Sequence, residues 1–418
     1  MQLLYADKEG NYYEHPTLRP AGRTGDRFVQ LVPEDMTELP SGASLVLIPG
    51  GSPVGVSGKG SFILADREYG GEGPAYSVGA LLPQGYTRTF LPAFRRRDRE
   101  KPLPLMGYAA VAWRRGRVYV AAVKTDDPHR WDPVHYNTPD LPRLVRALGR
   151  EMPGNRIVKQ LSRCALSYSC FTAQNIFYGR WEGGIPVSRT CNAACLGCIS
   201  LQPAECCPSP QSRIDFSPTV DEVVELGLRH LQGKDGPIIS FGQGCEGEPA
   251  MAWEVISEAL MKIRGSHSGG TININTNAGN TRAIEALCRA GLDSVRVSLI
   301  SARDEVYNSY YRPRGYSLGD VMASIRAANK HGVFVSLNLL VFPGLTDREE
   351  EVEALIPMIR DTGVNMVQLR NLNIDPDYLF GKIPPAKGDI LGIPALISAL
   401  ESVSGLELGN FSRPVNAP

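Results

Sequence analysis

The chain has 418 residues, with 44 basic and 44 acidic side chains and a formal net charge of zero, so its composition does not indicate nucleic acid or an anionic membrane as a partner. No apolar stretch approaches the roughly 18 residues of a membrane-spanning helix, and the N-terminal MQLLYADKEGNYY reaches charged residues before any long apolar run. We therefore predict a cytoplasmic protein, built as two domains or as one large α/β barrel with an extension.

The first 135 residues predict a β-rich N-terminal domain without a catalytic motif. Apolar runs at 43–51 and 75–83 are typical of strands, and 106–127 predicts a hairpin that turns at Arg114-Arg115-Gly116. Residues 136–180 predict a helical connector, in which Pro153-Gly154 separates two helices because neither residue suits a helix interior.

Residues 181–375 alternate between strand and helix patterns. Thr219 and Thr346 fit helix N-caps, while Gly291 and Gly332 follow helix ends, where a residue with positive φ is common. Six βα units with right-handed crossovers predict an α/β fold, with a parallel sheet curled into a partial (β/α)6 TIM-like barrel and a C-terminal extension at 376–418. The candidate strands are 184–189, 237–242, 271–276, 294–300, 333–342 and 365–372, and the candidate helices are 219–232, 250–264, 280–290, 318–331 and 347–361.

Three cysteines follow the first of these strands. Cys191, Cys195 and Cys198 form a C-x3-C-x2-C pattern. In a reducing cytosol, clustered cysteines more often bind metal or do redox chemistry than form disulfides. Structural zinc and ferredoxin clusters take four ligands, so a loop with three suits a [4Fe–4S] cluster whose fourth iron stays open to bind a substrate or cofactor. The loop also begins at the carboxyl end of a strand, where α/β sheets bind their ligands.

This cysteine pattern, placed after the first strand of a βα series, resembles the radical S-adenosylmethionine (radical SAM) superfamily, and the resemblance covers roughly 181–375. It implies that Cys191, Cys195 and Cys198 bind the irons of a [4Fe–4S] cluster. Members of the family often have an aromatic residue immediately before the third cysteine, where this chain has Gly197. The sequence therefore leaves open what packs at that position.

The resemblance also implies a site for S-adenosylmethionine (SAM) along successive strand ends. GQGCEGEP at 242–249 is similar to a Gly-Gly-Glu-Pro turn that meets the amino group of the methionine moiety, and NTNAG at 275–279 is similar to a Thr-Asn-Gly motif. An arginine, here Arg312 with Arg314 as a rival, is implied to pair with the carboxylate of SAM. The residues implied to bind SAM are Gly247, Glu248, Pro249, Thr276, Asn277, Ser298, Arg312 and Asn338.

The resemblance implies an enzyme. In the implied reaction the reduced cluster gives one electron to the sulfonium of SAM, which splits into methionine and a 5′-deoxyadenosyl radical that takes a hydrogen atom from a substrate. The sequence does not identify this substrate, a small molecule or a peptide, and an electron donor such as ferredoxin or flavodoxin is expected. Arg370, Asn371 and Asn373 end the sixth strand and point toward the active face, where we expect them to touch substrate.

Five further cysteines lie between 164 and 245, and they raise the question of an auxiliary iron–sulfur cluster. Cys206 and Cys207, in a Pro-rich loop soon after the first three, are the first candidates for its ligands. Buried or incidental thiols are the competing interpretation, and a redox or substrate-linking thiol is a third. The remaining members of the group are Cys164, Cys170 and Cys245.

Two other classes of protein also account for three clustered cysteines. The first is a non-catalytic iron–sulfur electron carrier or a metal-stabilised scaffold, which explains the cysteines but not the series of polar strand ends. The second is a zinc-binding nucleic-acid module with Cys206 or Cys207 as the fourth ligand, which the neutral net charge disfavours.

Overall fold

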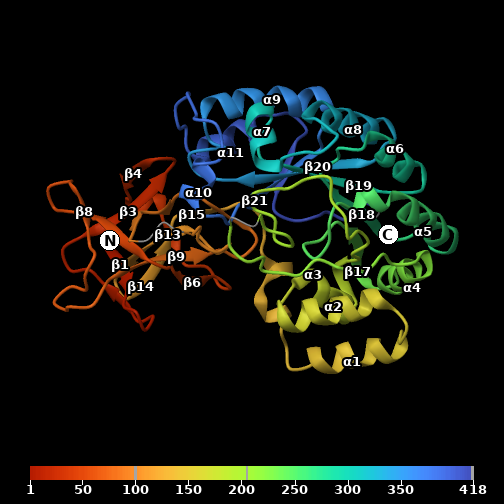
Figure 1. The fold of residues 1–418 in the computed structure, drawn as a ribbon, viewed down its shortest axis with the longest axis horizontal. Coiled ribbons are helices and arrows are strands. Elements are labelled where there is room, and N and C mark those ends of the chain that lie inside the picture. The colour runs from red at the N-terminus through yellow and green to blue at the C-terminus, as the bar shows by residue number, and fades with distance from the viewer. Residues whose placement is uncertain (98–100, 204–205, 416–418) are drawn as a thin grey trace.

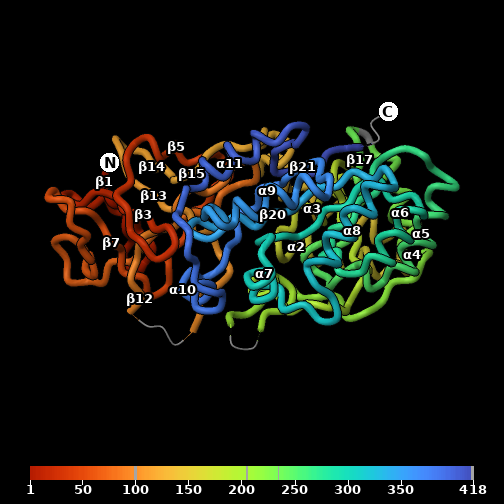
Figure 2. Tube along the Cα trace, turned by 90° about the horizontal axis from the view of Figure 1, so that it is seen from above, coloured from red at the N-terminus to blue at the C-terminus, as the bar shows by residue number. Residues whose placement is uncertain are grey.

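The computed structural model describes residues 1–97, 101–203 and 206–415. Figure 1 shows two bodies side by side, a β-rich body formed by the N-terminal residues and a larger α/β body formed by the rest of the chain. Figure 2, seen from above, shows the same elongated arrangement. The predicted β-rich N-terminal region and α/β architecture are confirmed.

The N-terminal region consists of antiparallel strands. In its described residues, one sheet has the order β2-β1-β9-β13-β14-β5 with β6 beside β9, a second has the order β11-β3-β7-β12 with β4 and β8 at its sides, and β10 pairs with β15. The strands are β1 Gln2–Ala6, β2 Tyr12–Glu14, β3 Arg19–Thr24, β4 Arg27–Gln30, β5 Thr37–Glu38, β6 Ser44–Leu47, β7 Gly51–Val56, β8 Phe62–Leu64, β9 Tyr76–Leu81, β10 Tyr86–Arg88, β11 Leu91–Pro92, β12 Phe94–Arg96, β13 Ala109–Arg114, β14 Arg117–Val120 and β15 Ala122–Lys124.

The predicted hairpin at 106–127 is confirmed. Strands β13 and β14 pair antiparallel, and Arg114 lies opposite Arg117. Arg115 and Gly116 between them have φ values of 49° and 81°, the positive pair that a two-residue hairpin turn of type I′ requires. The run at 43–51 is not one strand, because Gly50 has a φ of 64° and turns the chain between β6 and β7.

Three helices connect the two bodies. Helices α1 (Leu141–Glu151), α2 (Arg156–Ser167) and α3 (Phe171–Tyr178) confirm the helical pattern predicted for this segment, and Pro153-Gly154 lies between the first two. Asn155 caps α2, since its side-chain oxygen accepts hydrogen bonds from the backbone of Ile157 and Val158. Leu148 and Leu161 are buried in the same apolar core as the barrel, so the connector packs against it as part of one unit.

The described part of the α/β body contains a seven-stranded parallel sheet whose strands follow chain order, and its curl confirms the predicted partial barrel. The seventh strand, β22, comes from the segment predicted as a C-terminal extension. It has three residues, too few to show the alternation of polar and apolar residues that marks a strand. The strands are β16 Arg180–Gly184, β17 Lys234–Phe241, β18 Thr271–Thr276, β19 Ser294–Leu299, β20 Phe334–Val341, β21 Met366–Asn371 and β22 Glu407–Gly409.

Helices cover the outside of this sheet (Figure 1). Thr219 caps α4 in a capping box with Glu222, as the sequence predicts. The cap predicted at Thr346 is wrong: the helix begins after Arg348, and the Thr346 hydroxyl instead accepts a hydrogen bond from the backbone of Phe342, closing the turn after β20. The helices are α4 Val220–Leu231, α5 Trp253–Ser266, α6 Thr281–Arg289, α7 Asp304–Tyr311, α8 Leu318–Lys330, α9 Glu349–Thr362, α10 Pro376–Phe380 and α11 Ile393–Glu401.

The strands alternate between an apolar outer face and a polar inner face. In β19, Val295 and Val297 belong to the apolar core, whereas the intervening Arg296 reaches across the barrel interior to Glu182 of β16. Successive side chains of a strand point to opposite faces of its sheet, so the residues between apolar positions line the inside of the barrel. The interior is therefore polar, and it opens toward the carboxyl ends of the strands.

The first strand ends earlier than its sequence suggests. We predicted it at 184–189, but β16 ends at Gly184 and the chain leaves the sheet after Ile185. The reason is that the backbone N–H groups of Val187 and Ser188 donate to the carboxylate of Glu246, at 2.8 Å and 3.0 Å, and not to a neighbouring strand. The prediction of this strand is therefore wrong, and the loop that carries the cysteines begins at 185.

The N-terminal body docks on the end of β21. The Asn371 side chain accepts from the backbone of Arg88 at 2.9 Å and donates to the carbonyl of Tyr86 at 2.8 Å. The buried guanidinium of Arg88 donates to the carbonyl of Leu372 at 2.6 Å. These contacts bring the loop between β9 and β10 to the mouth of the barrel.

Candidate functional site

The cysteine loop is fastened on one side by the C-terminal end of α7. The backbone N–H groups of Ala194 and Leu196 donate to the carbonyls of Tyr311 and Tyr310, each at 3.0 Å. The last carbonyls of a helix lack partners within it, so the loop satisfies them while it is held in place. These bonds fix the backbone of the loop beside α7, although the described residues between Ile185 and Thr219 form no helix or strand.

The other side of the loop is fastened by the turn after β17. Gly247 and Glu248 donate their N–H groups to the carbonyls of Ser188 and Thr190, at 2.6 Å and 2.8 Å. A β-carbon at Gly247 would lie 2.0 Å from the carbonyl oxygen of Thr190, so only glycine permits this approach. The glycine that the sequence singled out thus serves the packing of the cysteine loop.

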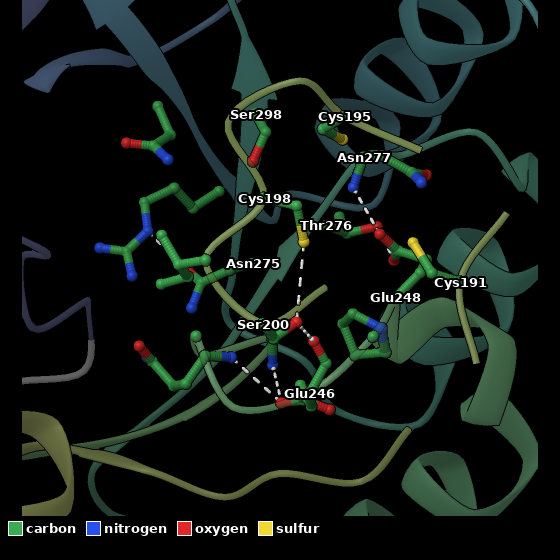
Figure 3. Close-up of a pocket in the computed structure, with 18 of the residues that line it drawn as sticks. Cys191, Cys195, Cys198, Ser200, Glu246, Glu248, Asn275, Thr276, Asn277 and Ser298 are labelled. Atoms are coloured by element: carbon green, nitrogen blue, oxygen red, sulfur yellow. Dashed lines mark hydrogen bonds between the residues drawn. The ribbon is translucent and has the colours of Figure 1, made fainter. Parts of the chain in front are cut away.

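Between these supports lies a cavity of about 450 Å³, within the usual range for small-molecule sites. Figure 3 shows the three cysteines around it, together with side chains from the ends of neighbouring strands. The predicted residues that the structure brings together on its wall are Cys191, Cys195, Cys198, Gly247, Glu248, Pro249, Thr276, Asn277, Ser298 and Asn338.

Glu246 ties the cysteine loop to the turn after β17. One carboxylate oxygen accepts from the backbone of Val187 and Ser188, and the other accepts from Gly242 at 2.6 Å and Gln243 at 3.1 Å. Burial raises the pKa of Glu246 to about 7, although four N–H donors favour its charged form. Glu246 is not among the site residues predicted from the sequence, although it lies in the turn at 242–249.

Glu248 is also buried, and its partners come from β18. Its carboxylate accepts from the Thr276 hydroxyl and from the backbone of Asn277 at 2.8 Å and Ala250 at 3.0 Å. Burial raises the pKa of this carboxyl. The Asn277 side chain then donates to Asn192 of the cysteine loop at 2.7 Å, so Glu248, Thr276 and Asn277 form one hydrogen-bonded network with that loop.

Two amide side chains on the cavity wall have a polar atom without a hydrogen-bond partner among the described residues. Ser298 and Asn338 lie side by side on β19 and β20, and Asn275 lies on the neighbouring β18. Among the described residues, Oδ1 of Asn338 and Nδ2 of Asn275 are buried without a hydrogen-bond partner. Buried polar groups are normally paired, so these atoms indicate positions where a polar ligand binds.

The three cysteines provide the donors that an iron–sulfur cluster needs. Burial raises the pKa of the Cys191 thiol and raises that of Cys195 well above its usual value, so iron binding would release protons. Among the described residues, no three Cys, His, Asp or Glu side chains are grouped as ligands of a single metal ion. A cube has a different requirement, because each thiolate binds its own iron.

Tyr310 occupies the space beside Gly197. A β-carbon at Gly197 would lie 2.7 Å from the Tyr310 hydroxyl oxygen, and both residues line the cavity. The aromatic group that the sequence lacks before Cys198 is therefore supplied from α7. This contact has no signal in the sequence, because 113 positions separate the two residues.

Arg312 and Arg314 are placed differently from the prediction. Neither is among the described residues that line the cavity; Arg312 ends α7 in the left-handed conformation, with a φ of 48°, and Arg314 is exposed. The prediction that one of them faces the carboxylate of a ligand in this cavity thus gains no support from the geometry. Asn371 and Asn373, expected at the substrate, instead contact Arg88 of the N-terminal body.

The cavity also has charged residues beyond those implied to bind SAM, and one of them, Arg370, is among the three residues expected to touch substrate. Arg296 pairs with Glu182 at 2.9 Å inside the barrel, and both are buried. Arg370 lines the same cavity together with Gln84 and Trp131, which precede the barrel in sequence. The period-2 pattern of the strands contained a signal for Arg296, because a charged residue between two valines of a buried strand points to the other face.

The remaining cysteines lie outside the cavity lining. The thiols of Cys206 and Cys207 are 3.6 Å apart. The pKa of Cys164 is lowered, first by a hydrogen bond from the thiol of Cys245, so α2 and the turn after β17 bring these two together. Cys170 begins α3 nearby and donates its N–H to the carbonyl of Cys164 at 3.1 Å.

The model of the radical SAM superfamily matches residues 185–356 of the chain, from the start of the cysteine loop into α9. Residues 185–356 are a radical SAM domain. Members of this superfamily use a [4Fe–4S] cluster and SAM, and they generally need a reductant. The radical SAM domain contains each of the three cysteines and each of the strand ends that line the cavity up to β20.

Two curated proteins are similar to part of the chain. An uncharacterized protein of Methanocaldococcus jannaschii is 22% identical over 220 residues, 53% of this chain and 61% of that protein. GTP 3′,8-cyclase of Streptomyces coelicolor is 28% identical over 180 residues, 41% of this chain and 48% of that enzyme. The similarity thus spans about half the length of each relative.

Solved structures are also similar to part of the chain. A radical SAM methyltransferase from Sphaerobacter thermophilus is 20% identical with a TM-score of 0.40, over 55% of this chain and 65% of that one. In the described residues, no helix is both long enough and apolar enough to cross a membrane.

Proposed function

We propose that the protein is a radical SAM enzyme, which cleaves SAM reductively and uses the resulting radical to take a hydrogen atom from a substrate. One observation supports this most strongly: three thiols of one loop line the same cavity as Glu248, Asn277 and Asn338, which lie after β17, after β18 and within β20. When bound, the cluster supplies the electron that splits SAM into methionine and a 5′-deoxyadenosyl radical.

In this proposal, different residues of the chain bind the cluster and the parts of SAM. Cys191, Cys195 and Cys198 hold the cluster, and the turn at 247–249 holds the methionine end of SAM. The unpaired amide atoms of Asn275 and Asn338 are free to bind the polar groups of SAM. The buried carboxylates and the enclosing N-terminal residues keep water away from the reacting atoms. A low-potential carrier such as ferredoxin or flavodoxin supplies the electron.

The test uses the full chain, reconstituted with iron and sulfide without oxygen and reduced with dithionite. We expect it to convert SAM to 5′-deoxyadenosine, and we expect Cys191→Ala, Cys195→Ala and Cys198→Ala each to lower the rate by at least about a hundredfold, because each removes an iron ligand. Cys288→Ala on α6 is the matched control, since Cys288 does not line the cavity among the described residues.

Two results would contradict the proposal. Full cleavage activity in the variant of any loop cysteine would separate the reaction from the cluster. A brown, cluster-loaded protein that produces no 5′-deoxyadenosine would favour the alternative of an iron–sulfur electron carrier.

An auxiliary cluster with Cys206 or Cys207 as a ligand is a separate proposal. The same anaerobic preparation decides it by iron analysis. About eight irons per chain would support a second [4Fe–4S] cluster, and about four would exclude one.

A further inference from the structure

One wall of the cavity is formed by β21 and the N-terminal body, and it presents the guanidinium of Arg370. Its Nη1 donates to the side-chain oxygen of Gln84, from the loop between β9 and β10, and its Nη2 donates to Gln368 at 3.2 Å. Gln84 and Arg370 both line the cavity. The wall is therefore built jointly by the barrel and by a segment that lies outside the radical SAM domain.

The charge of Arg370 is not balanced by a carboxylate. Among the described residues no acidic side chain lies within salt-bridge distance of it, and both of its partners are neutral amides. Burial, followed by repulsion from the neighbouring guanidinium of Arg296, lowers the pKa of Arg370 to about 9. A guanidinium removed from water needs a countercharge or a full set of hydrogen bonds.

The two acidic residues that raise the pKa of Arg370 each form an ion pair with another arginine. Glu182 pairs with Arg296 at 2.9 Å. Asp126 lies 3.1 Å from the guanidinium of Arg413 and accepts a hydrogen bond from the backbone of Asn410 at 2.8 Å. Both carboxylates are thus paired with other guanidinium groups, which leaves Arg370 without a carboxylate partner among the described residues.

We propose that Arg370 and Gln84 bind an anionic group of the substrate, a carboxylate or a phosphate, and this inference rests on the proposed function. A guanidinium matches the two oxygens of such a group with two parallel N–H donors, and the amide of Gln84 offers a further donor beside it. Gln368 is a positioning residue, because its oxygen accepts from both Arg296, at 3.0 Å, and Arg370.

SAM also has a carboxylate, so the anion has two possible sources. The positions implied to bind SAM run from Gly247 to Asn338, within the radical SAM domain, whereas Arg370 and Gln84 lie beyond its two ends. SAM binding is the function expected of the radical SAM domain, so we expect residues outside it to bind something else. The position of both residues outside the radical SAM domain therefore favours the substrate as the source of the anion.

The experiment measures the binding of inorganic phosphate to the oxidised, cluster-loaded full chain by titration calorimetry, with and without saturating SAM. We expect saturable binding that is unchanged by SAM, and a loss of at least tenfold in affinity in Arg370→Gln. Gln84→Ala should lose several-fold, and Arg370→Lys should retain part of the affinity. The matched control is Arg326→Gln, which removes one exposed charge on α8.

The proposal is overturned if the wild-type protein shows no saturable phosphate binding, or if Arg370→Gln binds as tightly as wild type. Competition between phosphate and SAM would also overturn it, because the anion would then be that of SAM. Retained SAM affinity shows that Arg370→Gln is folded, and Gln84→Ala tests the same wall through a different side chain. Failure of the proposed function has its own readout, namely absence of 5′-deoxyadenosine while phosphate still binds.

Discussion

Gly197 shows how a single position depends on a distant residue. Its missing side chain leaves room for Tyr310, whose hydroxyl oxygen lies 2.7 Å from where a β-carbon would be. Tyr310 is buried, and its pKa is raised well above the usual value, first by that burial. The ring therefore stays neutral beside Cys195 and Cys198 and supplies apolar cover where the cysteine loop has none of its own.

The contact between Gly197 and Tyr310 can be tested by substituting both residues. Gly197→Phe should push Tyr310 out of its place and distort the loop, which lowers the iron content of the reconstituted protein. Gly197→Phe combined with Tyr310→Ala should recover part of it, because the new ring then fills the vacated space. The measurement is iron per chain with the absorbance near 400 nm, and a double variant no better than Gly197→Phe alone would contradict the exchange.

At the scale of elements, the alternation of strand and helix was predictable because each barrel strand buries apolar residues with period 2. Strand β18 at 271–276 is confirmed residue for residue. The end of β16 was not predictable, since it depends on Glu246, which lies about sixty positions later. The residues of the site that lie on motifs were predicted, and Arg296 has a signal in the period-2 pattern of β19, whereas Tyr310 and Gln84 reach the cavity only through tertiary packing.

The junction between β10 and β21 depends on one amide side chain. Asn371→Ala would leave the N–H of Arg88 and the carbonyl of Tyr86 without their partner, so we expect the free energy of unfolding to fall by about 1–3 kcal/mol. Denaturant unfolding measures this loss. Asn373→Ala is the control, because it removes a single contact with Arg88, at 3.3 Å, and should cost less. Equal losses in the two variants would contradict this account of the junction.

At the scale of the whole molecule, His230 makes stability depend on pH. Burial lowers its pKa to about 4, its Nε2 donates to the carbonyl of Trp181 at 2.8 Å, and Nδ1 has no partner among the described residues. The unfolded chain, with a histidine pKa of about 6.5, binds the proton more readily than the folded protein. Stability due to His230 is therefore complete above that value and is lost as pH falls toward 4.

The expected size of this effect at pH 5 is about 2 kcal/mol. Glu246, with a pKa of about 7, acts in the opposite direction over part of the same range, because the folded state holds its proton more tightly than the unfolded chain. The difference between wild type and His230→Gln isolates the histidine. Unfolding free energies at pH 7.5 and pH 5 should show a smaller loss in His230→Gln, and parallel pH dependence would contradict the assignment.

Strand β22 is the last strand of the parallel sheet in chain order. It pairs with β21, and just beyond it the Ser412 hydroxyl accepts a hydrogen bond from Arg296 inside the barrel at 2.7 Å. A ribosome makes this segment after every other strand of the sheet, so the growing polypeptide exposes an open β21 edge and an incompletely bonded Arg296 until then. The barrel sheet is thus complete only after β22, its shortest described strand, has been synthesised.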